Sequence, residues 1–426
     1  MKIKKIKNKK FILSLFSLFI LCMMLASPVS YLYADDYAPA IAPFNVRSAG
    51  MGSVSAAVAD DWYLFFSNPA GLTLESKYQN PDGEWMINYD LIGINFGHSF
   101  IDLITFISDN ADTFGEIGDL ENMSDEDMDV INEGMDKLIG TGYVIGVQPI
   151  YLSFMLGGGT WNVGAALYGV TDNTFSLNNT VVPRINLNLE ARAGGIVSFA
   201  FNISDLTNVD LHVGISVKMF GGTHYYTVKH IYDVENLPDE IVDSLTNIGF
   251  GMGFDLGFIY ESPEISIAKI AIGNIRAGLV FQDIYTFISN QVSTVDEISN
   301  VSTEAEALRV QPDIGLGVAW IINFGFLPDM IMGPPIVSLE LSDMLEADTS
   351  GLLMLKFGAE IPLFNLTGGN YILVLRGGLN QGYLVGGATL GLWYVDINYA
   401  FNQREKGVYP GQIVEQTHML SISFRF

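Results

Sequence analysis

The chain has 426 residues, of which 49 % are hydrophobic and only 16 % are charged, with a formal net charge of −26. A strongly acidic chain is repelled by phosphate, so we expect no nucleic acid among its partners. So little charge among so many apolar residues is unusual for a soluble globular protein and favours residence in a membrane.

The N-terminus has the layout of a cleaved secretory signal. Six lysines lie in the first ten residues, an apolar run follows from Phe11 to Leu25, and small residues lead to Ala34. We therefore predict a signal over residues 1–34. Its removal takes away six lysines and no acidic residue, which moves the formal charge from −26 to −32.

The chain has one cysteine, Cys22, and it lies inside the predicted signal. A lipoprotein anchored at Cys22 is an alternative, but bulky residues precede this cysteine where a lipobox needs small ones. The mature chain then has no disulfide, no catalytic thiolate and no metal bound by cysteine.

Three short motifs follow the signal: Arg47-Ser-Ala-Gly-Met-Gly52, Ala59-Asp60-Asp61 and Phe65-Phe66-Ser67-Asn68-Pro69-Ala70-Gly71-Leu72. The glycines permit tight turns, the Asn-Pro pair favours a turn, and the two phenylalanines are apolar. This pattern predicts a compact plug over residues 35–76. The residues we expect to carry function there are Arg47, Gly50, Gly52, Phe65, Phe66, Asn68, Pro69, Ala70 and Gly71.

Two segments have helical rather than strand periodicity. Residues 101–139 form a predicted helical insert, with Ser124 as a candidate N-cap, and residues 238–247 form a second candidate that begins with a proline. The polar stretch 293–306 is expected to be an external loop.

Apolar residues alternate with polar or small ones along most of the remaining chain, as in residues 184–192, 197–204, 213–219, 314–320 and 393–401. Two long runs without charge, 138–171 and 377–395, are broken by proline or paired glycines. They therefore lack the ~20 unbroken apolar residues that a spanning helix needs. A soluble β-sandwich would show the same alternation and is the alternative fold.

The C-terminal strand favours the membrane alternative. Leu420, Ile422, Phe424 and Phe426 share one face, and Ser421, Ser423 and Arg425 share the other. A sheet can satisfy all its backbone groups inside hydrocarbon only as a closed barrel. We therefore predict an all-β fold, a transmembrane antiparallel β-barrel over residues 77–426 in the outer membrane of a double-membraned bacterium. The four apolar residues are the expected signal for the barrel-assembly machinery.

An enzymatic function is not indicated. The five histidines show no metal-binding spacing and there is no G-x-S-x-G motif. Gly249-x-Gly251-x-Gly253 precedes a predicted strand where a dinucleotide site needs a helix. We expect no enzyme activity, no cofactor and no metal.

The motifs R-x-x-G-M-G, A-D-D and N-P-A-G-L, together with the closing strand His418–Phe426, resemble the FadL-type family of outer-membrane long-chain fatty acid transporters and its PorV-like relatives. The resemblance extends through residues 85–88, 254–257 and 311–313, so it covers the mature chain. It implies a 14-stranded barrel with the plug as a hatch in the lumen.

The resemblance also implies a function, the passive uptake of small hydrophobic molecules such as long-chain fatty acids. Such ligands would bind above the hatch and leave past it or through the wall, with outer-membrane lipids as the other partners. The insert at 101–139 departs from the family pattern, and no basic pocket residue can be assigned. Two alternatives remain open: a PorV-like barrel that scaffolds or shuttles secreted proteins, and a surface adhesin or antigen.

Overall fold

The computed structural model describes most of the chain from the plug to the C-terminal strand. The described residues are 37–38, 42–74, 86–109, 142–158, 160–178, 184–207, 209–230, 248–267, 271–289, 293–296, 301–304, 307–324, 331–345, 350–367, 370–405, 410–411 and 414–425. The predicted signal over residues 1–34 lies outside them, as do both expected ends of the plug. These boundaries stay predictions.

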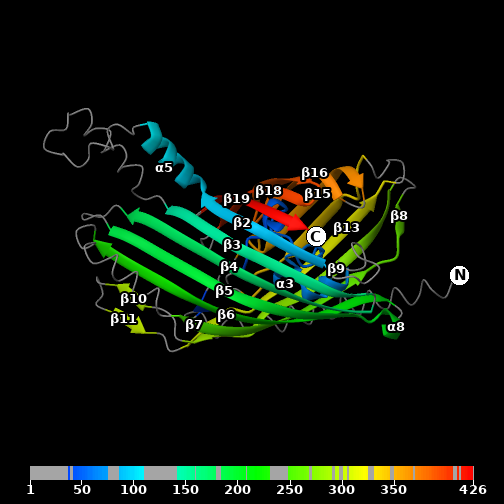
Figure 1. Ribbon diagram of the computed structural model, residues 1–426, viewed down its shortest axis with the longest axis horizontal. Helices are drawn as coiled ribbons and strands as arrows, with labels where there is room; N and C mark the ends of the chain where they lie inside the picture. Colours follow the sequence, from blue (N-terminus) through cyan, green and yellow to red (C-terminus); the bar gives the residue numbers. More distant parts are fainter. Residues whose placement is uncertain are drawn as a thin grey trace.

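Fourteen antiparallel strands close into a ring in this part of the chain (Figure 1). They are β2 Met86–Gly97, β3 Gly142–Gly158, β4 Trp161–Asn178, β5 Arg184–Asn202, β6 Asp210–His230, β7 Gly249–Glu261, β9 Ala271–Ser289, β13 Asp313–Asn323, β14 Ile336–Leu341, β15 Leu355–Thr367, β16 Asn370–Asn380, β17 Tyr383–Leu392, β18 Val395–Glu405 and β19 Val414–Arg425. Each pairs with the next in this order, and β19 pairs with β2. The predicted all-β barrel of fourteen strands is confirmed.

The two ends of the barrel differ in their connections. The strand β19 ends where β2 begins, since Arg425 pairs with Asn88, and we call this the C-terminal end. The longest connections between wall strands, residues 98–141 and 290–312, lie at the other end, which we call the loop end. Extracellular loops of outer-membrane barrels are the long ones, so this asymmetry gives the barrel a direction.

Five short strands extend the ring: β1 Tyr37–Ala38, β8 Ile265–Ile267, β10 Ser293–Asp296, β11 Val301–Glu304 and β12 Ala307–Val310. The strands β10 and β11 pair with each other, and β10 also pairs with β6. The stretch 293–306, predicted to be an external loop, thus contains a short hairpin within the connection between β9 and β13, and its external position stays a prediction.

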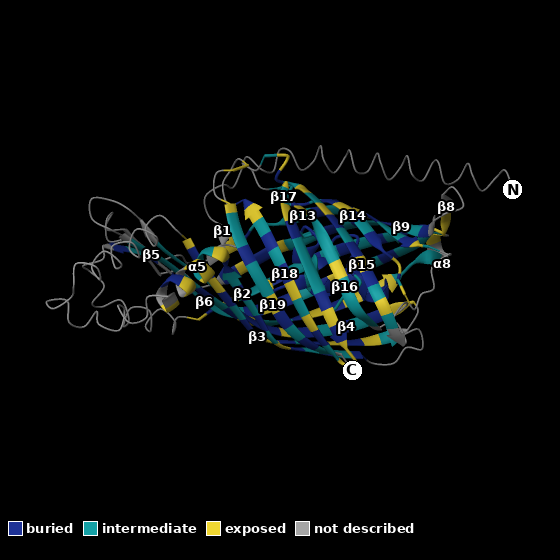
Figure 2. Cartoon of the chain, turned by 90° about the horizontal axis from the view of Figure 1, so that it is seen from above, coloured by how far each residue is buried: buried dark blue, intermediate teal, exposed yellow. Residues whose placement is uncertain are grey.

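Outside the bulges, side chains alternate between the two faces of the wall, and Figure 2 shows buried and exposed residues alternating along the strands. Exposed apolar residues cover the outside, among them Trp161, Leu167, Phe199, Phe201, Met219, Leu339, Leu375 and Leu420. Buried polar residues face the inside, among them Asn88, Asn95, Gln148, Ser153, Ser198, Ser216, Glu340, Ser421 and Ser423. An apolar exterior of this extent is suited to lipid and not to water.

The predicted alternations fall on wall strands with two adjustments. Residues 184–192 and 197–202 belong to one strand, β5, which keeps the same faces throughout, and the predicted strand ran two residues too far, to Ser204, where α8 begins. Trp393 does not begin β18: it has a positive φ of 54° and forms a turn with Tyr394 between β17 and β18. The predicted strand began at Trp393, ahead of the observed start of β18 at Val395, because aromatic residues also occur in tight turns at a membrane interface.

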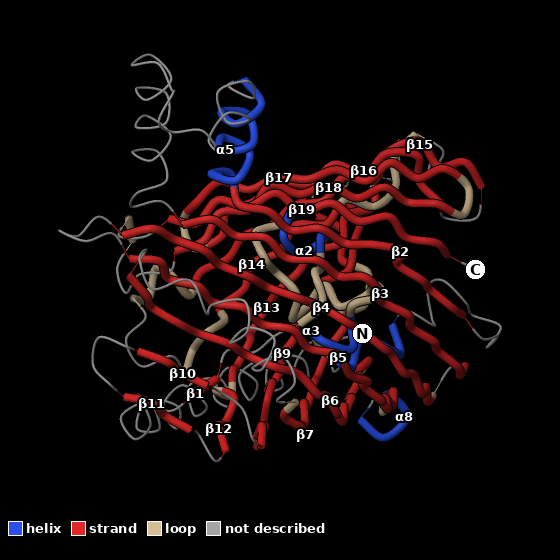
Figure 3. Tube along the Cα trace, turned by 60° about the vertical axis from the view of Figure 1, so that its left-hand side comes forward, coloured by secondary structure: helices blue, strands red, loops and turns tan. Residues whose placement is uncertain are grey.

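Helices are few in the described part of the chain: α2 Val46–Gly50, α3 Leu64–Ser67, the 3-10 turn η1 Pro69–Gly71, α5 His98–Asp109 and α8 Ser204–Thr207. The strands enclose α2 and α3, while α5 projects away from the ring (Figures 1 and 3). Helix α5 begins three residues before the insert predicted at 101–139. The rest of that insert and the candidate helix at 238–247 lie outside the described residues.

No helix among the described residues is long and apolar enough to cross a membrane.

Because the outer face of β19 is assigned to lipid, a charged side chain on that face should lower the free energy of unfolding. Leu420 lies on the outer face in the middle of this strand, so Leu420→Arg should reduce the unfolding free energy in lipid vesicles by about 2–4 kcal/mol. Leu420→Phe is the matched control and should leave it nearly unchanged. Reversible denaturant unfolding gives both values, and an equal stability of the two variants would contradict a lipid-facing β19.

Candidate functional site at the hatch and lumen

Residues 42–74, which we call the hatch, fold inside the ring. Asn45 caps α2, because its side chain accepts a hydrogen bond from the Ser48 N–H at 2.9 Å. Helix α2 lies directly on β17, and a Cβ at Gly50 would be only 3.1 Å from the Gly387 Cα. Gly52 has a φ of +72° and the Phe357 carbonyl against it, so both glycines of the motif are required by backbone geometry and close approach.

The Asn-Pro-Ala-Gly turn lies against the opposite side of the wall. The Asn68 side chain accepts a hydrogen bond from the Ala70 N–H at 3.1 Å and donates to the Ala56 carbonyl at 2.8 Å. Glycines on the wall make room for it: a Cβ at Gly214 would be 2.3 Å from Pro69, and one at Gly257 would be 2.0 Å from Asn68. The turn therefore positions the hatch on β6 and β7.

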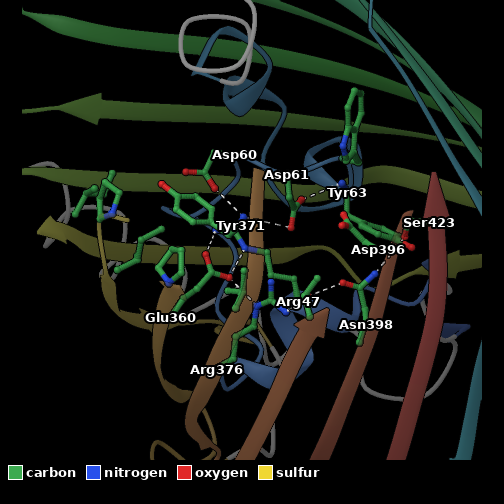
Figure 4. A pocket seen from close by; sticks show the side chains of 18 of the residues that line it. Arg47, Asp60, Asp61, Tyr63, Glu360, Tyr371, Arg376, Asp396, Asn398 and Ser423 are labelled. Atoms are coloured by element: carbon green, nitrogen blue, oxygen red, sulfur yellow. Dashed lines mark hydrogen bonds and ion pairs between the residues drawn. The ribbon is translucent and has the colours of Figure 1, made fainter. Parts of the chain in front are cut away.

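A chain of alternating charges crosses the lumen through the hatch (Figure 4). Arg47 donates to Asp60 at 2.7 Å and binds both carboxylate oxygens of Glu360 at 2.9 Å. Arg276 on β9 bonds Asp60 at 2.5 Å and Glu261 of β7 at 3.0 Å. Arg376 on β16 bonds Glu360 at 2.6 Å, so six charged groups run in the order Glu261, Arg276, Asp60, Arg47, Glu360 and Arg376.

The two aspartates of the Ala-Asp-Asp motif differ in their proton affinity. Burial alone raises the pKa of Asp60, but the Arg47 and Arg276 guanidinium groups outweigh it and lower that pKa to about 2. Asp61 is 3.6 Å from Arg47 and has no second arginine beside it, so burial and the nearby Asp60 carboxylate keep its pKa raised. Asp60 is therefore the aspartate that binds the hatch to the wall.

Aromatic and polar contacts complete the attachment. Tyr63 stacks on Tyr151 of β3 with ring centroids 4.6 Å apart, and its hydroxyl donates to Asp90 of β2. Burial and the Asp90 carboxylate raise the pKa of Tyr63, so it stays a neutral donor. Glu340 of β14 accepts from the N–H groups of Ser55 and Ala56 at 2.6 and 2.7 Å.

Two cavities that share no lining residue meet the hatch. The larger, of about 490 Å³, opens toward the C-terminal end and is lined by the charged chain and by further polar residues, including Asp61, Asn88, Asp90, Asp396, Asn398, Ser421 and Ser423. We call it the vestibule. Its charged and hydrogen-bonding lining suits water and not an apolar ligand.

The smaller cavity, of about 120 Å³, lies between Phe66 of the hatch and the wall strands β4, β5, β6 and β9, and we call it the Phe66 cavity. Three aromatic rings line it, those of Phe66, Tyr168 and Phe220, and Phe66 meets Tyr168 edge-on at 5.0 Å. Two cations also line it, Lys218 and Arg192.

The two cations of the Phe66 cavity differ in their partners. Lys218 is neutralised by Asp255 at 2.8 Å and Asp283 at 2.7 Å. Arg192 pairs with Glu190 through one terminal nitrogen and lies 5.6 Å above the Phe220 ring. Within the described residues its buried Nε has no hydrogen-bond partner. The cavity thus combines three aromatic rings with charged and polar side chains, and one of these, Arg192, has a buried N–H group without a partner in the described part of the chain.

A bulge in β9 links this cavity to the hatch. The register between β7 and β9 shifts twice here, and Asp283 has a positive φ of 53°. As a result the successive residues Gln282 and Asp283 both line the cavity, and Gln282 donates to the Phe66 carbonyl at 2.6 Å. Movement of the hatch end at Phe66 is therefore coupled to the wall.

The structure places the residues predicted from the sequence in different roles. Arg47 lies at the centre of the charged chain and Phe66 lines the smaller cavity, whereas Phe65 is fully buried in the core and Asn68, Pro69, Ala70 and Gly71 pack on the wall. Leu420, Ile422 and Phe424 lie on the outer row of β19, and Phe426 is outside the described residues. The assembly role of these four stays a prediction.

Sequence reasoning missed the wall partners of the hatch: Glu261, Arg276, Glu340, Glu360 and Arg376, with Arg192 and Lys218 at the cavity. A signal was present, because each is a charged residue at an inward position of a strand whose outward positions are mostly apolar. Such a position is costly unless a partner lies inside the barrel.

Among the described residues, no group of three or more histidine, cysteine, aspartate or glutamate side chains could hold a metal ion.

No protein-family model matches the sequence, and neither does any curated protein. Solved structures to which the chain is similar include the toluene transporter TbuX of Ralstonia pickettii, with a TM-score of 0.44 and 13 % identity over 90 % of this chain and 97 % of that one. The toluene transporter TodX of Pseudomonas putida has a TM-score of 0.41 and 13 % identity over 91 % and 99 %. The monoaromatic hydrocarbon channel CymD has a TM-score of 0.38 and 13 % identity over 90 % and 98 %. At these values the likeness assigns no function, and the barrel fold rests on the strand ladder itself.

The lowered pKa of Asp60 predicts that acid releases the hatch. A carboxylate with a pKa of about 2 when docked, against an ordinary 3.8, stabilises docking fully above about pH 4 and progressively less as the pH falls toward 2. At one pKa unit per ~1.4 kcal/mol this is worth roughly 2 kcal/mol, which Asp60→Asn should remove at neutral pH. Asp61→Asn should strengthen docking instead. Burial raises the pKa of Asp61, which means that its ionised form destabilises the docked hatch at neutral pH, and asparagine carries no charge.

A nitroxide on Trp62→Cys, in a chain with Cys22 replaced, reports hatch mobility by electron paramagnetic resonance. We expect the wild-type label to become mobile between pH 4 and 2 and the Asp60→Asn label to be more mobile already at pH 7. Equal mobility of the two at every pH would show that Asp60 does not hold the hatch.

Proposed function

We propose that this protein is an outer-membrane channel for the passive uptake of small hydrophobic molecules, and that the Phe66 cavity is its ligand site. The observation that carries the proposal is this cavity. It combines three aromatic rings with a buried N–H group that has no partner among the described residues, and it lies between the hatch and the bulge of β9. Sites for small ligands typically combine apolar and aromatic side chains with polar groups that orient the ligand, and this cavity has both kinds.

The size of the cavity argues for a small ligand. An engineered apolar cavity of ~150 Å³ in another protein holds one benzene molecule, so about 120 Å³ suits a single ring or the end of an alkyl chain. Each buried methylene would contribute ~0.8 kcal/mol to binding. A long-chain fatty acid would fit only in part, with the remainder outside the cavity.

The difference between the two ends of the barrel supports a direction of ligand passage. The loop end faces outward if the long connections are extracellular, and the vestibule then faces the periplasm. A ligand in the Phe66 cavity would meet the hatch before it met the charged vestibule, so release requires the hatch to move. The charged chain is the element that holds the hatch in place.

Arg192 supports selection for a ligand that carries an acceptor. The Nε–H group of Arg192, which has no partner within the described residues, would donate a charge-assisted hydrogen bond to a carboxylate or phenolic oxygen placed in the cavity. A plain hydrocarbon would leave this donor unpaired, so the two ligand classes should differ in affinity.

Filling the cavity should block uptake. Val310 lines it and is buried, so Val310→Phe should lower uptake of a radiolabelled single-ring hydrocarbon at least tenfold in liposomes, normalised to folded barrel. Val318→Phe introduces the same side chain on the outer face and serves as the control. Uptake that survives Val310→Phe in a folded barrel would favour the scaffold or adhesin alternatives, which need no luminal ligand.

Removing the donor should change selectivity without closing the site. Arg192→Met should weaken binding of an aromatic carboxylate about 10- to 100-fold, the usual value of a hydrogen bond to a charged group, and leave a hydrocarbon of the same size unaffected. Arg404→Met, at an exposed position on β18, is the control. Equal losses for both ligands would mean that Arg192 supports the fold and does not select the ligand.

A further inference from the structure

Two histidines meet on the outside of the barrel, at the seam where the first and last wall strands pair. His98 is the first residue of α5, directly after β2, and His418 lies on β19. The Nδ1 atom of His98 is 3.2 Å from the Nε2 atom of His418, and the pair is exposed. The two residues are 320 positions apart in the sequence, and only closure of the barrel brings them together.

The separation of the two nitrogens fits a shared metal ion. Imidazole nitrogens bind Zn²⁺ at 2.0–2.1 Å in tetrahedral geometry, which places two of them roughly 3.3 Å apart. The observed 3.2 Å is within the tolerance of such a site. A small rotation of either ring would point both lone pairs at one ion.

The neighbours of His418 hold its ring in the orientation that a ligand needs. Its Nδ1 is 2.8 Å from the Tyr399 hydroxyl, and when it donates to that oxygen its Nε2 lone pair faces His98. Phe96 stacks on the same ring at 5.5 Å, and Phe401 lies at 5.2 Å. Metal-bound histidines usually have such a partner on the second nitrogen.

We propose that His98 and His418 form a two-histidine site for a late transition-metal ion such as Zn²⁺, with water in the remaining positions. Imidazole suits Zn²⁺, Ni²⁺ and Cu²⁺, whereas Ca²⁺ and Mg²⁺ prefer oxygen ligands. The acidic chain raises the local concentration of cations. The bound ion would join β2 to β19 and so stabilise the seam of the ring. This inference does not depend on the proposed transport function.

The test uses the mature protein folded in detergent. Zinc is titrated in competition with a chromophoric chelator, and the temperature at which the folded band is lost in SDS is measured with Zn²⁺ or with EDTA. We expect wild type to bind one more Zn²⁺ per chain than His98→Ala, His418→Ala or the double variant. Zinc should raise the transition temperature in wild type only.

Three further variants separate a metal site from a structural hydrogen bond. His98→Gln keeps a hydrogen-bonding group but removes the imidazole, so it should lose the zinc effect while staying folded. Tyr399→Phe should weaken zinc affinity about 10- to 100-fold, as expected for the loss of an orienting partner. His224→Ala changes a luminal histidine bonded to Asn188 and should leave the extra zinc in place.

Zinc binding that is the same in wild type and in the folded His98→Gln or double variant would overturn the proposal. An equal rise in transition temperature with Ca²⁺ would also overturn it, because acidic loops and not imidazoles would then be the ligands.

Discussion

Backbone N–H and C=O groups cannot stay unpaired in hydrocarbon, and this constraint determines the rest of the structure. It is met by an unbroken ladder through fourteen strands, closed where β19 pairs with β2. Closure fixes the two faces of every strand, since successive side chains point to opposite sides of the wall. The outer face is then mostly apolar, and the inner face is free to bind the hatch.

Charged side chains bind the hatch on the inner face of the wall, because the outer face contacts lipid, where a charge is costly. The chain from Glu261 to Arg376 places four wall residues and two hatch residues in alternation, so each of these six charges has an opposite neighbour. Removal of one partner from a buried pair typically costs 3–5 kcal/mol, because the other charge stays buried without compensation. The hatch is thus held by linked ion pairs, so loss of one partner also exposes the charge of its neighbour.

On the side of the wall that carries Gly214 and Gly257, the hatch is held by close packing and not by charge. At Gly214 and Gly257 the absence of a side chain lets the Asn68-Pro69 turn lie directly on the strand backbone. Steric fit fixes the hatch there, and ion pairs fix it on β9 and β15, where Arg276 binds Asp60 and Glu360 binds Arg47. Between these attachments lies the Phe66 cavity, beside the bulge of β9 that places Gln282 against the Phe66 carbonyl. A ligand there would touch the element that connects hatch and wall.

The sequence by itself determined what depends on local periodicity and on local turn chemistry. The period-2 alternation fixed the outer row of β5, β6, β13 and β19, and the motifs around Gly52 and Asn68 marked the hatch, because these signals need only neighbouring residues. It failed where a local signal is ambiguous, as at the Trp393 turn, and it did not contain the pairing of β10 with β11 and β6 inside the predicted loop 293–306. Only the tertiary structure decided which wall residues face Arg47 and Asp60, that Arg192 lines the Phe66 cavity, and that His98 meets His418. Those contacts join positions tens to hundreds of residues apart, and the register of the closed ring, which no local pattern contains, sets them.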